Sequence, residues 1–245
     1  AVGDAVEIQP AGLAARVRGL QVHGQAAPRV APGSRCAVNL QGVELAQLAR
    51  GQVLTAPGAL APTRTADVRL VWLDAAPESA KPVSVELLIA TAQRRARVAP
   101  IGEPRLRPGT RRFARLHVEG EPLALLPGDR FVVRGFARTA LGGTTLGGGT
   151  ILDVAPPRGR RADPGLARDL AALEGGVPEE GLAVRIRRAG LAGAAAERLR
   201  RETGLTPEAL GEALAALRAA GRAEATAGGA WLDAETLREL EARLL

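Results

Sequence analysis

The first 155 residues alternate short apolar runs with turns rich in proline and glycine. The runs include TADVRLVWL, VSVELLIATA and DRFVVRGFA, and the turns include APG, RPG and PGD segments. Short strands bounded by such turns are typical of all-β barrels and sandwiches. The segment APGALAPTRT has no hydrophobic period and divides this part of the chain. We therefore predict two β units, residues 1–62 and 63–155.

The pattern changes after residue 155. The segment PPRGRRAD, residues 156–163, is predicted to be a solvated linker, because Pro-Pro continues neither a strand nor a helix interior. Beyond it, Asp163-Pro164 and Thr206-Pro207 each combine a helix cap with proline at the first helical position. Successive helices followed by a short β-hairpin predict an α+β winged-helix domain over residues 164–232. Residues 233–245 are predicted to form a helix that leads to a further module.

The chain has a net charge of +7, and the whole excess lies in residues 1–155. That part has 19 basic and 12 acidic side chains, whereas residues 156–245 have 14 of each. Lys81 is the only lysine. Guanidinium groups suit phosphates, so the excess favours a polyanionic partner. A GC-rich genome would also enrich alanine, glycine and arginine, and charge alone leaves both explanations open.

The segment TTLGGGTILDV, residues 144–154, first suggests a phosphate-binding loop. A Walker-type loop needs G-x-x-x-x-G-K-[ST], and this segment has no lysine. An apolar strand pattern over residues 150–154 follows the glycines, where a nucleotide loop would open a helix. We therefore predict a barrel strand whose glycines permit a bend or the close approach of a neighbouring backbone.

Nothing in the sequence indicates catalysis or a metal site. His23 and His117 lie far apart, and the HExxH, CxxC and GxSxG patterns are absent. We expect no catalytic residue, no metal and no cofactor in this chain. The single Cys36 forms no intrachain disulfide, which favours a cytoplasmic protein. No run of about 20 apolar residues and no signal peptide is present, so we expect no membrane contact. The chain contains no methionine and is expected to be an internal piece of a longer protein.

Two segments resemble translational GTPases of the EF-Tu group. NLQGVELAQLARGQVLTAPG, residues 39–58, resembles the end of their second domain, and residues 123–154, LALLPGDRFVVRGFARTALGGTTLGGGTILDV, resemble the last strands of their third. RVRGLQVHG, the GGGTILD ending and a winged helix after the barrels point more narrowly to the selenocysteine-specific elongation factor family, SelB. The resemblance implies two EF-Tu-like antiparallel β-barrels, the first incomplete, followed by the winged helix.

This resemblance implies a function. The parent protein would be a GTPase that delivers selenocysteinyl-tRNA to the ribosome at recoded UGA codons, acting as a monomer. This piece would bind tRNA and connect the GTPase domain to C-terminal winged helices that contact an mRNA hairpin. GTP and Mg²⁺ belong to a domain that this sequence does not contain, so the chain itself is not expected to be an enzyme.

The resemblance also assigns site residues. Arg50, in the R-G-x-V-L run, matches a family arginine near the tRNA 3′ end and its amino acid, and Gln47 matches a neighbouring acidic position. Six arginines fall in the part that meets the tRNA acceptor and T stems in the family, where phosphate contacts are independent of sequence and sensitive to salt. They are Arg94, Arg95, Arg97, Arg111, Arg112 and Arg115.

Two other readings are compatible with parts of this pattern. One is a DNA-binding regulator whose winged helix reads an operator while the β units sense a ligand. The predicted recognition helix, residues 206–220, carries Glu208 and Glu212 but only one arginine, Arg218, which disfavours base reading. The other is a different EF-Tu-like factor of the initiation or ribosome-rescue type, which the C-terminal winged helix disfavours.

Overall fold

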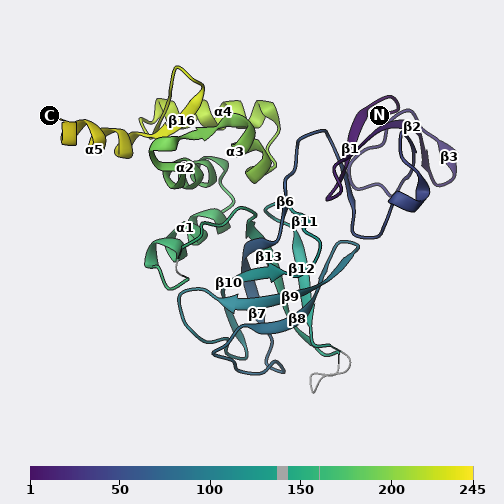
Figure 1. Ribbon diagram of the computed structural model, residues 1–245, viewed down its shortest axis with the longest axis horizontal. Coiled ribbons are helices and arrows are strands. Elements are labelled where there is room, and N and C mark those ends of the chain that lie inside the picture. The colour runs from purple at the N-terminus through teal and green to yellow at the C-terminus, as the bar shows by residue number, and fades with distance from the viewer. Residues whose placement is uncertain (137–142, 160, 245) are drawn as a thin grey trace.

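The computed structural model describes residues 1–136, 143–159 and 161–244 (Figure 1). Residues 137–142, within the segment 123–154 that resembles the end of the third domain, and residue 160 of the predicted linker lie outside the described residues. An N-terminal sheet, a central β-barrel and a C-terminal helical part follow one another along the chain (Figure 1). The first 155 residues are thus β-rich and helices follow, which confirms the coarse prediction from the sequence.

The N-terminal sheet is open. Its path is β3-β2-β1-β5, and β4 pairs with β2 off this path. Few of its side chains are buried, chiefly Ile8, Val17 and Leu20, because no second layer covers most of the sheet in the described chain. Its elements are β1 (Ala5–Gln9), β2 (Leu13–Val22), β3 (Gln25–Ala26), β4 (Ala37–Gln41), the 3₁₀ helix η1 (Leu45–Gln47) and β5 (Val53–Thr55).

Six antiparallel strands form a closed barrel in the order β10-β7-β13-β12-β8-β9. Alternate side chains point inward and fill the barrel, among them the fully buried Trp72, Leu70 and Leu116. The short strands β6 (Pro62–Thr63) and β11 (Leu123–Ala124) pair beside it. The barrel strands are β7 (Thr65–Trp72), β8 (Val83–Ile89), β9 (Ala92–Pro100), β10 (Thr110–Val118), β12 (Arg130–Arg134) and β13 (Thr145–Asp153).

The three consecutive glycines lie inside β13, between β7 and β12. The strand begins at Thr145 and is therefore longer than the predicted residues 150–154. At each glycine an added Cβ would clash with a backbone carbonyl oxygen of a neighbouring strand, so the glycines allow these strands to approach. The clash distances are 2.4 Å for Gly147 to Val71, 2.7 Å for Gly148 to Phe131 and 1.8 Å for Gly149 to Arg69.

The helical part combines five α-helices and one 3₁₀ helix with a small antiparallel sheet ordered β14-β16-β15. The side chains of Asp163 and Thr206 cap α1 and α4 by accepting hydrogen bonds from backbone amides, as the sequence predicts. No described helix is long and apolar enough to cross a bilayer. The elements are α1 (Pro164–Glu174), α2 (Pro178–Ala189), η2 (Gly190–Ala192), β14 (Ala194–Ala195), α3 (Ala196–Thr203), α4 (Pro207–Ala219), β15 (Ala223–Ala225), β16 (Ala230–Asp233) and α5 (Ala234–Leu244).

Helix α1 packs against the barrel, whereas α2, α3 and α4 share a separate core. Leu166 and Leu170 of α1 are buried with Ile101 and Leu152, and Phe113 completes this cluster. The second core contains residues of α2, α3 and α4, with Trp231 packed against it. Helix α1 thus joins the outer face of the barrel to the rest of the helical part.

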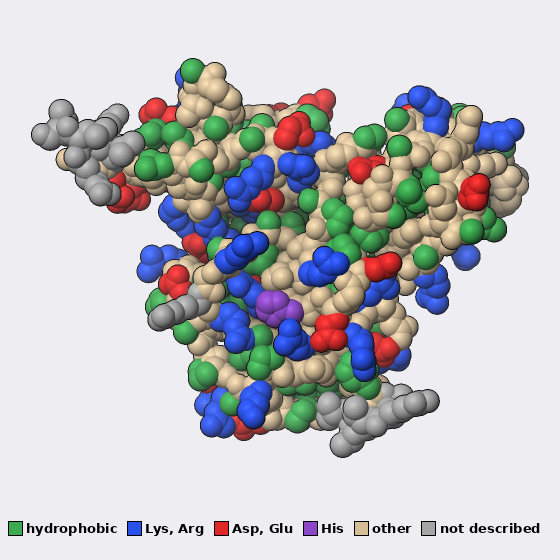
Figure 2. Space-filling view, viewed as in Figure 1, with side chains coloured by type: hydrophobic (Ala, Val, Ile, Leu, Met, Phe, Trp, Pro, Cys, Tyr) green, Lys and Arg blue, Asp and Glu red, His purple; other side chains and the backbone are tan. Residues whose placement is uncertain are grey.

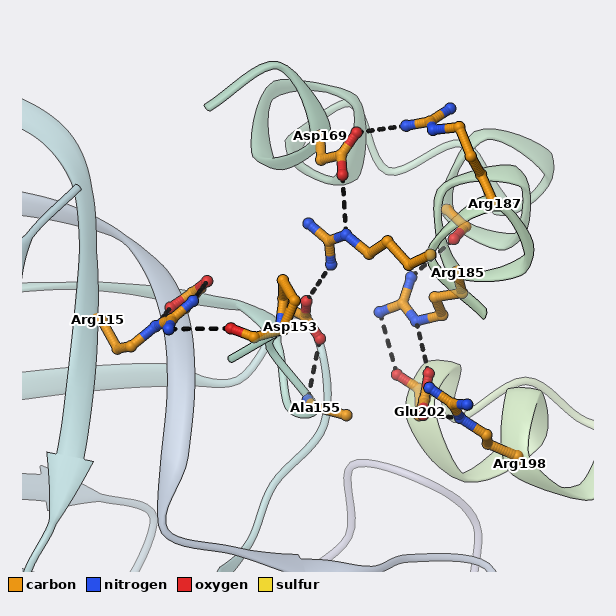
Figure 3. Close-up of polar contacts among 12 residues, drawn as sticks. Arg115, Asp153, Ala155, Asp169, Arg185, Arg187, Arg198 and Glu202 are labelled. Carbon is orange, nitrogen blue, oxygen red and sulfur yellow. Dashed lines mark hydrogen bonds and ion pairs between the residues drawn. The ribbon is translucent and has the colours of Figure 1, made fainter. Parts of the chain in front are cut away.

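Ion pairs reinforce this junction (Figure 3). Asp153, at the end of β13, accepts a hydrogen bond from Arg188 of α2 at 2.6 Å. Arg188 also donates to Asp169 of α1 at 2.8 Å. The side chains of Asp153, Arg188 and Asp169 are each at most 15% exposed, so water screens this chain of charges weakly. It ties the barrel to two helices.

Candidate nucleic-acid interface

Arg50 is positioned by the glycine that follows it. The backbone amide of Gly51 donates to the Thr91 hydroxyl at 3.1 Å, which docks the N-terminal part on the hairpin between β8 and β9. Gly51 has a φ of +92°, and a Cβ there would lie 3.0 Å from the Ala92 Cα. Only glycine suits both the conformation and the contact. The R-G pair therefore brings Arg50 to the barrel.

Arg50 lines one open hollow with two predicted barrel arginines, Arg94 and Arg95. The hollow has a volume of about 420 Å³. It is called the arginine hollow below, and its lining residues are Arg50, Glu86, Thr91, Gln93, Arg94 and Arg95. The tertiary structure thus brings together residues 44 or more positions apart in the sequence, from two different β units.

The charge of the arginine hollow is positive. Its one lining carboxylate, Glu86, already accepts close hydrogen bonds from Arg134 and from Gln93. These two bonds lower the pKa of Glu86, and the bond from Arg134 has the larger effect. The carboxylate therefore stays ionised, and its oxygens are already hydrogen-bonded. The guanidinium of Arg95 stacks 5.0 Å from the centre of the Phe136 ring, which orients it without using its N–H donors.

The third arginine of the hollow, Arg94, is partly engaged. It donates to the Gln93 carbonyl at 3.0 Å and to Glu121 at 3.2 Å. Its Nε is buried with no described hydrogen-bond partner. Arg50 and Arg95 are exposed and have donors to offer. Two exposed guanidinium forks around an open hollow suit a phosphate or a carbonyl oxygen.

Gln47 lies in η1, in the turn that precedes Arg50. Its side-chain oxygen accepts from the backbone amide of Glu44 at 2.8 Å, and its own backbone carbonyl accepts from Gln52 at 3.1 Å. The first of these contacts belongs to a capping box between Glu44 and Gln47 on η1. Gln47 does not line the arginine hollow. Its clearest contribution is to hold the turn that leads to Arg50.

Arg97 lies on a second basic surface of the barrel. It faces His117 across β9 and β10 and forms an ion pair of 3.7 Å with Glu119. Burial lowers the pKa of His117, and the charges of Arg115, Arg97 and Arg161 lower it further, so this imidazole is neutral near pH 7. Figure 2 shows blue side chains around the purple histidine on this face. The sequence singled out Arg97 but gave no signal that Arg161 of the linker also lies near His117.

Arg111 and Arg112 are engaged elsewhere on the barrel. Arg111 donates to Glu174 of α1 at 2.6 Å, and Arg69 binds the same carboxylate. Arg112 bonds to the Arg105 carbonyl and lies 3.2 Å from Glu103. Neither residue lines the arginine hollow. Arg111 keeps an exposed side chain, and Arg112 is mostly covered.

Arg115 does not fit its predicted role. Its guanidinium forms two hydrogen bonds with Asp67, at 2.6 and 2.8 Å, and a third with the Pro157 carbonyl at 3.1 Å. The two side chains are 7% and 0% exposed. Burial raises the pKa of Asp67, and the hydrogen bonds from Arg115 oppose that shift. A guanidinium held in this way is not available to a phosphate, so this prediction is corrected.

The bonds from Arg69 and then Arg111 lower the pKa of Glu174 from its ordinary 4.5, although burial opposes them. The stability from this carboxylate is therefore present above pH 4.5 and is lost as the pH falls through its lower folded-state value. We expect Glu174→Gln to lower stability by about 1 kcal/mol at pH 7. The difference from the parent chain should shrink toward pH 3 in melting experiments. Glu212→Gln, at an exposed position beyond the first turn of α4, is the control and should change neither the stability at pH 7 nor its pH dependence.

The glycine-rich segment does not fit a nucleotide. Its glycines are enclosed between strands, and their missing side chains are replaced by neighbouring backbone. In the described part of the chain, no three His, Cys, Asp or Glu side chains gather in a way that could hold a metal ion.

Comparison with known proteins places the chain in a family. Residues 66–158 match the family model for the β-barrel domain of the selenocysteine-specific elongation factor. The selenocysteine-specific elongation factor of Desulfomicrobium baculatum is 33% identical over 214 residues, which cover 87% of this chain. The chain belongs to the family of selenocysteine-specific elongation factors, SelB. It spans about a third, 33%, of the length of this curated relative.

Two solved SelB structures share the fold. The crystal structure of the bacterial selenocysteine-specific elongation factor EF-Sec has a TM-score of 0.74 at 20% identity and covers 99% of this chain and 36% of that one. The apo elongation factor SelB from Methanococcus maripaludis has a TM-score of 0.51 at 18% identity and covers 63% and 37%. The first similarity includes the N-terminal sheet, the barrel and the helical part together. The SelB barrel match itself includes Arg94 and Arg95 of the arginine hollow.

Proposed function

We propose that this chain is the part of a SelB-type factor that binds selenocysteinyl-tRNA. The parent protein would be a GTPase that delivers this tRNA to the ribosome in the cytoplasm at recoded UGA codons. The observation that carries the proposal is the arginine hollow, where Arg50 of the N-terminal part meets Arg94 and Arg95 of the barrel. Membership of the SelB family supports the choice of tRNA as the polyanion.

The domain reading that accompanies this proposal keeps the boundaries predicted from the sequence. Residues 1–62 form a partial barrel of the second-domain type and residues 63–155 one of the third-domain type. Residues 156–163 link them to a winged helix over residues 164–232, and residues 233–245 lead onward to modules that contact an mRNA hairpin. The order of α2, α3 and α4 around a three-stranded antiparallel sheet supports the winged-helix reading.

The proposed tRNA contacts divide by accessibility. Arg50 and Arg95 would bind the aminoacyl end or the adjacent backbone, with Arg94 supporting them. Arg97 and Arg111, whose side chains are 57% and 66% exposed, would contact stem phosphates by exchanging their surface ion pairs. Such exchange has a low cost, because exposed ion pairs contribute little. Gln47 and Arg112 would act by holding the local backbone.

Replacing Arg50 with alanine should weaken binding of selenocysteinyl-tRNA by roughly 10- to 100-fold, since a hydrogen bond to a charged group contributes roughly 1.5–3 kcal/mol. The slope of log K against log salt concentration should fall by about 0.7–0.9, the value for one phosphate contact. Filter binding at several salt concentrations measures both quantities.

The control for this experiment is Arg130→Ala. Arg130 is exposed on β12, away from the arginine hollow, and should leave affinity and slope unchanged. Equal losses in the two variants, or binding by the parent chain that does not depend on salt, would contradict the proposed tRNA binding.

A DNA-binding regulator is the less favoured alternative. Helix α4 would be its recognition helix, and Glu208 and Glu212 on this helix are exposed. Carboxylates there would repel the phosphates that flank a major groove. Tight binding of random duplex DNA that is lost without residues 164–244 would favour this alternative.

A further inference from the structure

A small pocket lies where the linker crosses between the barrel and the helical part. Its volume is about 220 Å³, which is several times the roughly 30 Å³ that one water takes up in the liquid. It is lined by the end of β13, the first linker residues, and side chains of α2 and α3. We call it the linker pocket. Its lining residues are Asp153, Ala155, Pro156, Pro157, Arg158, Arg185, Arg188, Arg198 and Glu202.

The charges around the linker pocket do not balance. Four guanidinium groups face two carboxylates, and both carboxylates are already engaged. Asp153 accepts from Arg188 at 2.6 Å and from the Ala155 amide at 2.9 Å. Glu202 accepts from Arg198 at 2.7 Å. The lining therefore has an excess of two positive charges, which falls to one when Asp169, outside the lining but bonded to Arg188 at 2.8 Å, is counted.

Two guanidinium nitrogens at this pocket are buried without hydrogen bonds. They are the Nε of Arg185 and one Nη of Arg188. The Arg185 side chain is only 5% exposed, and its Nε lies 3.8 Å from Glu202, too far for a hydrogen bond. A buried charged donor without a partner is costly, and native proteins rarely leave such donors unsatisfied. The Nη atoms of Arg185 donate to the Gly181 and Glu202 carbonyls at 2.9 and 3.2 Å, which leaves its charge without a close carboxylate. An anion in the pocket would offset this buried positive charge.

The remaining two arginines leave the pocket accessible. Arg158 is exposed and makes no hydrogen bond or ion pair within the described residues, and Arg198 is 48% exposed with only its Nε engaged. Burial lowers the pKa of Arg185, and the neighbouring charge of Arg188 lowers it further. Asp153 and Glu202 act in the opposite direction. An anion in the pocket would favour the charged form of Arg185, as these two carboxylates do.

We propose that the linker pocket is a binding site for a phosphate group, held by Arg158 of the linker, Arg185 and Arg188 of α2, and Arg198 of α3. Guanidinium forks match the oxygens of a phosphate, and one group here would bridge the linker to two helices. The site is separate from the arginine hollow and does not depend on the proposed tRNA binding. The phosphate is either free or part of a nucleic-acid backbone.

The first test uses inorganic phosphate as the probe and the full chain. Phosphate is exchanged for chloride at constant ionic strength while the melting temperature is followed. We expect a saturable rise of roughly 3–5 °C at ten times the dissociation constant. The double variant Arg158→Gln/Arg198→Gln should lose this rise. Arg168→Gln, at an exposed position on α1 outside the pocket, should keep it.

If the double variant fails to fold, the single variant Arg158→Gln replaces it, because this side chain makes no described hydrogen bond or ion pair. The inference is overturned if phosphate gives no saturable rise in the parent chain, or if the Arg158 variants keep the full rise. Arg50→Ala should keep the rise, so failure of the proposed tRNA binding and failure of this site give different results.

The second test separates the two sources of phosphate. An RNA duplex of random sequence is bound to the parent chain and to Arg158→Gln/Arg198→Gln, with and without inorganic phosphate at constant ionic strength. A backbone source predicts several-fold weaker RNA binding in the double variant and competition by phosphate in the parent. A free-anion source predicts equal RNA binding throughout, together with the thermal shift of the first test.

Discussion

Gly149→Ala is expected to destabilise the barrel by about 3 kcal/mol, at the upper end of the range for overpacked interiors. The added Cβ would lie 1.8 Å from the Arg69 carbonyl oxygen, which is backbone and cannot rotate away. Strands β13 and β7 would therefore have to separate where they close the barrel. Urea unfolding in a Trp231→Phe background, where the fully buried Trp72 reports on the barrel alone, measures the effect.

The loss of stability on substitution by alanine should be larger where the clash distance at the glycine is shorter. Gly149→Ala should cost most, then Gly147→Ala at 2.4 Å and Gly148→Ala at 2.7 Å. Gly211→Ala is the matched control, because a Cβ at this exposed position in α4 meets nothing within 4 Å. It should stabilise its helix by about 0.5–1 kcal/mol. If Gly149→Ala and Gly211→Ala change stability equally, close strand approach does not explain the run of glycines.

Asp67→Ala is expected to cost about 3–5 kcal/mol, the range for removing one partner of a buried ion pair. The Arg115 guanidinium would remain buried with the Pro157 carbonyl as its one hydrogen-bond partner among the described residues. The Trp72 signal in urea reports the loss of stability. Trypsin should also cut faster within residues 156–163, because the linker is fixed partly through Arg115.

Two controls separate a buried charge from a lost contact. Asp67→Leu combined with Arg115→Met removes both charges and should cost much less than Asp67→Ala, since the desolvation of the pair is also removed. Glu121→Ala breaks the exposed pair with Arg94, where Glu121 is 76% exposed, and should cost less than about 1 kcal/mol. A cost for Asp67→Ala as small as that of Glu121→Ala would show that the pair is unimportant.

The sequence predicted the coarse fold well, because the signals that carried it are local. Alternating strands bounded by Pro-Gly turns predicted the β-rich part, and Asp163 and Thr206 cap helices as their positions next to proline indicate. The SelB resemblance, based on residues 39–58 and 123–154, is confirmed by the family match. The extent of β13 was predicted less well, because glycine is a poor indicator of strands.

The candidate site was predicted only in part. The resemblance singled out Arg50, Arg94 and Arg95, but no sequence pattern indicated that they meet. The resemblance gave Arg115 and Arg97 the same role. The fold pairs Arg115 with the buried Asp67, whereas it pairs Arg97 with the exposed Glu119. The linker pocket was missed, since its arginines occur in PPRGRRAD, VRIRRAG and ERLRRE, which read as an ordinary solvated linker and two ordinary helices.

By itself the sequence determined the β-rich character of the first part, the helices that follow it, and the family. Each depends on turns, caps and apolar periods that neighbouring residues specify. Only the tertiary structure decided which arginines are free. Arg115 is neutralised by Asp67, 48 positions away, and Arg50 is brought to Arg94 by the contact of Gly51 with Thr91, 40 positions away. The accessibility of a charge depends on which partner the fold brings to it, and local pattern does not contain that partner.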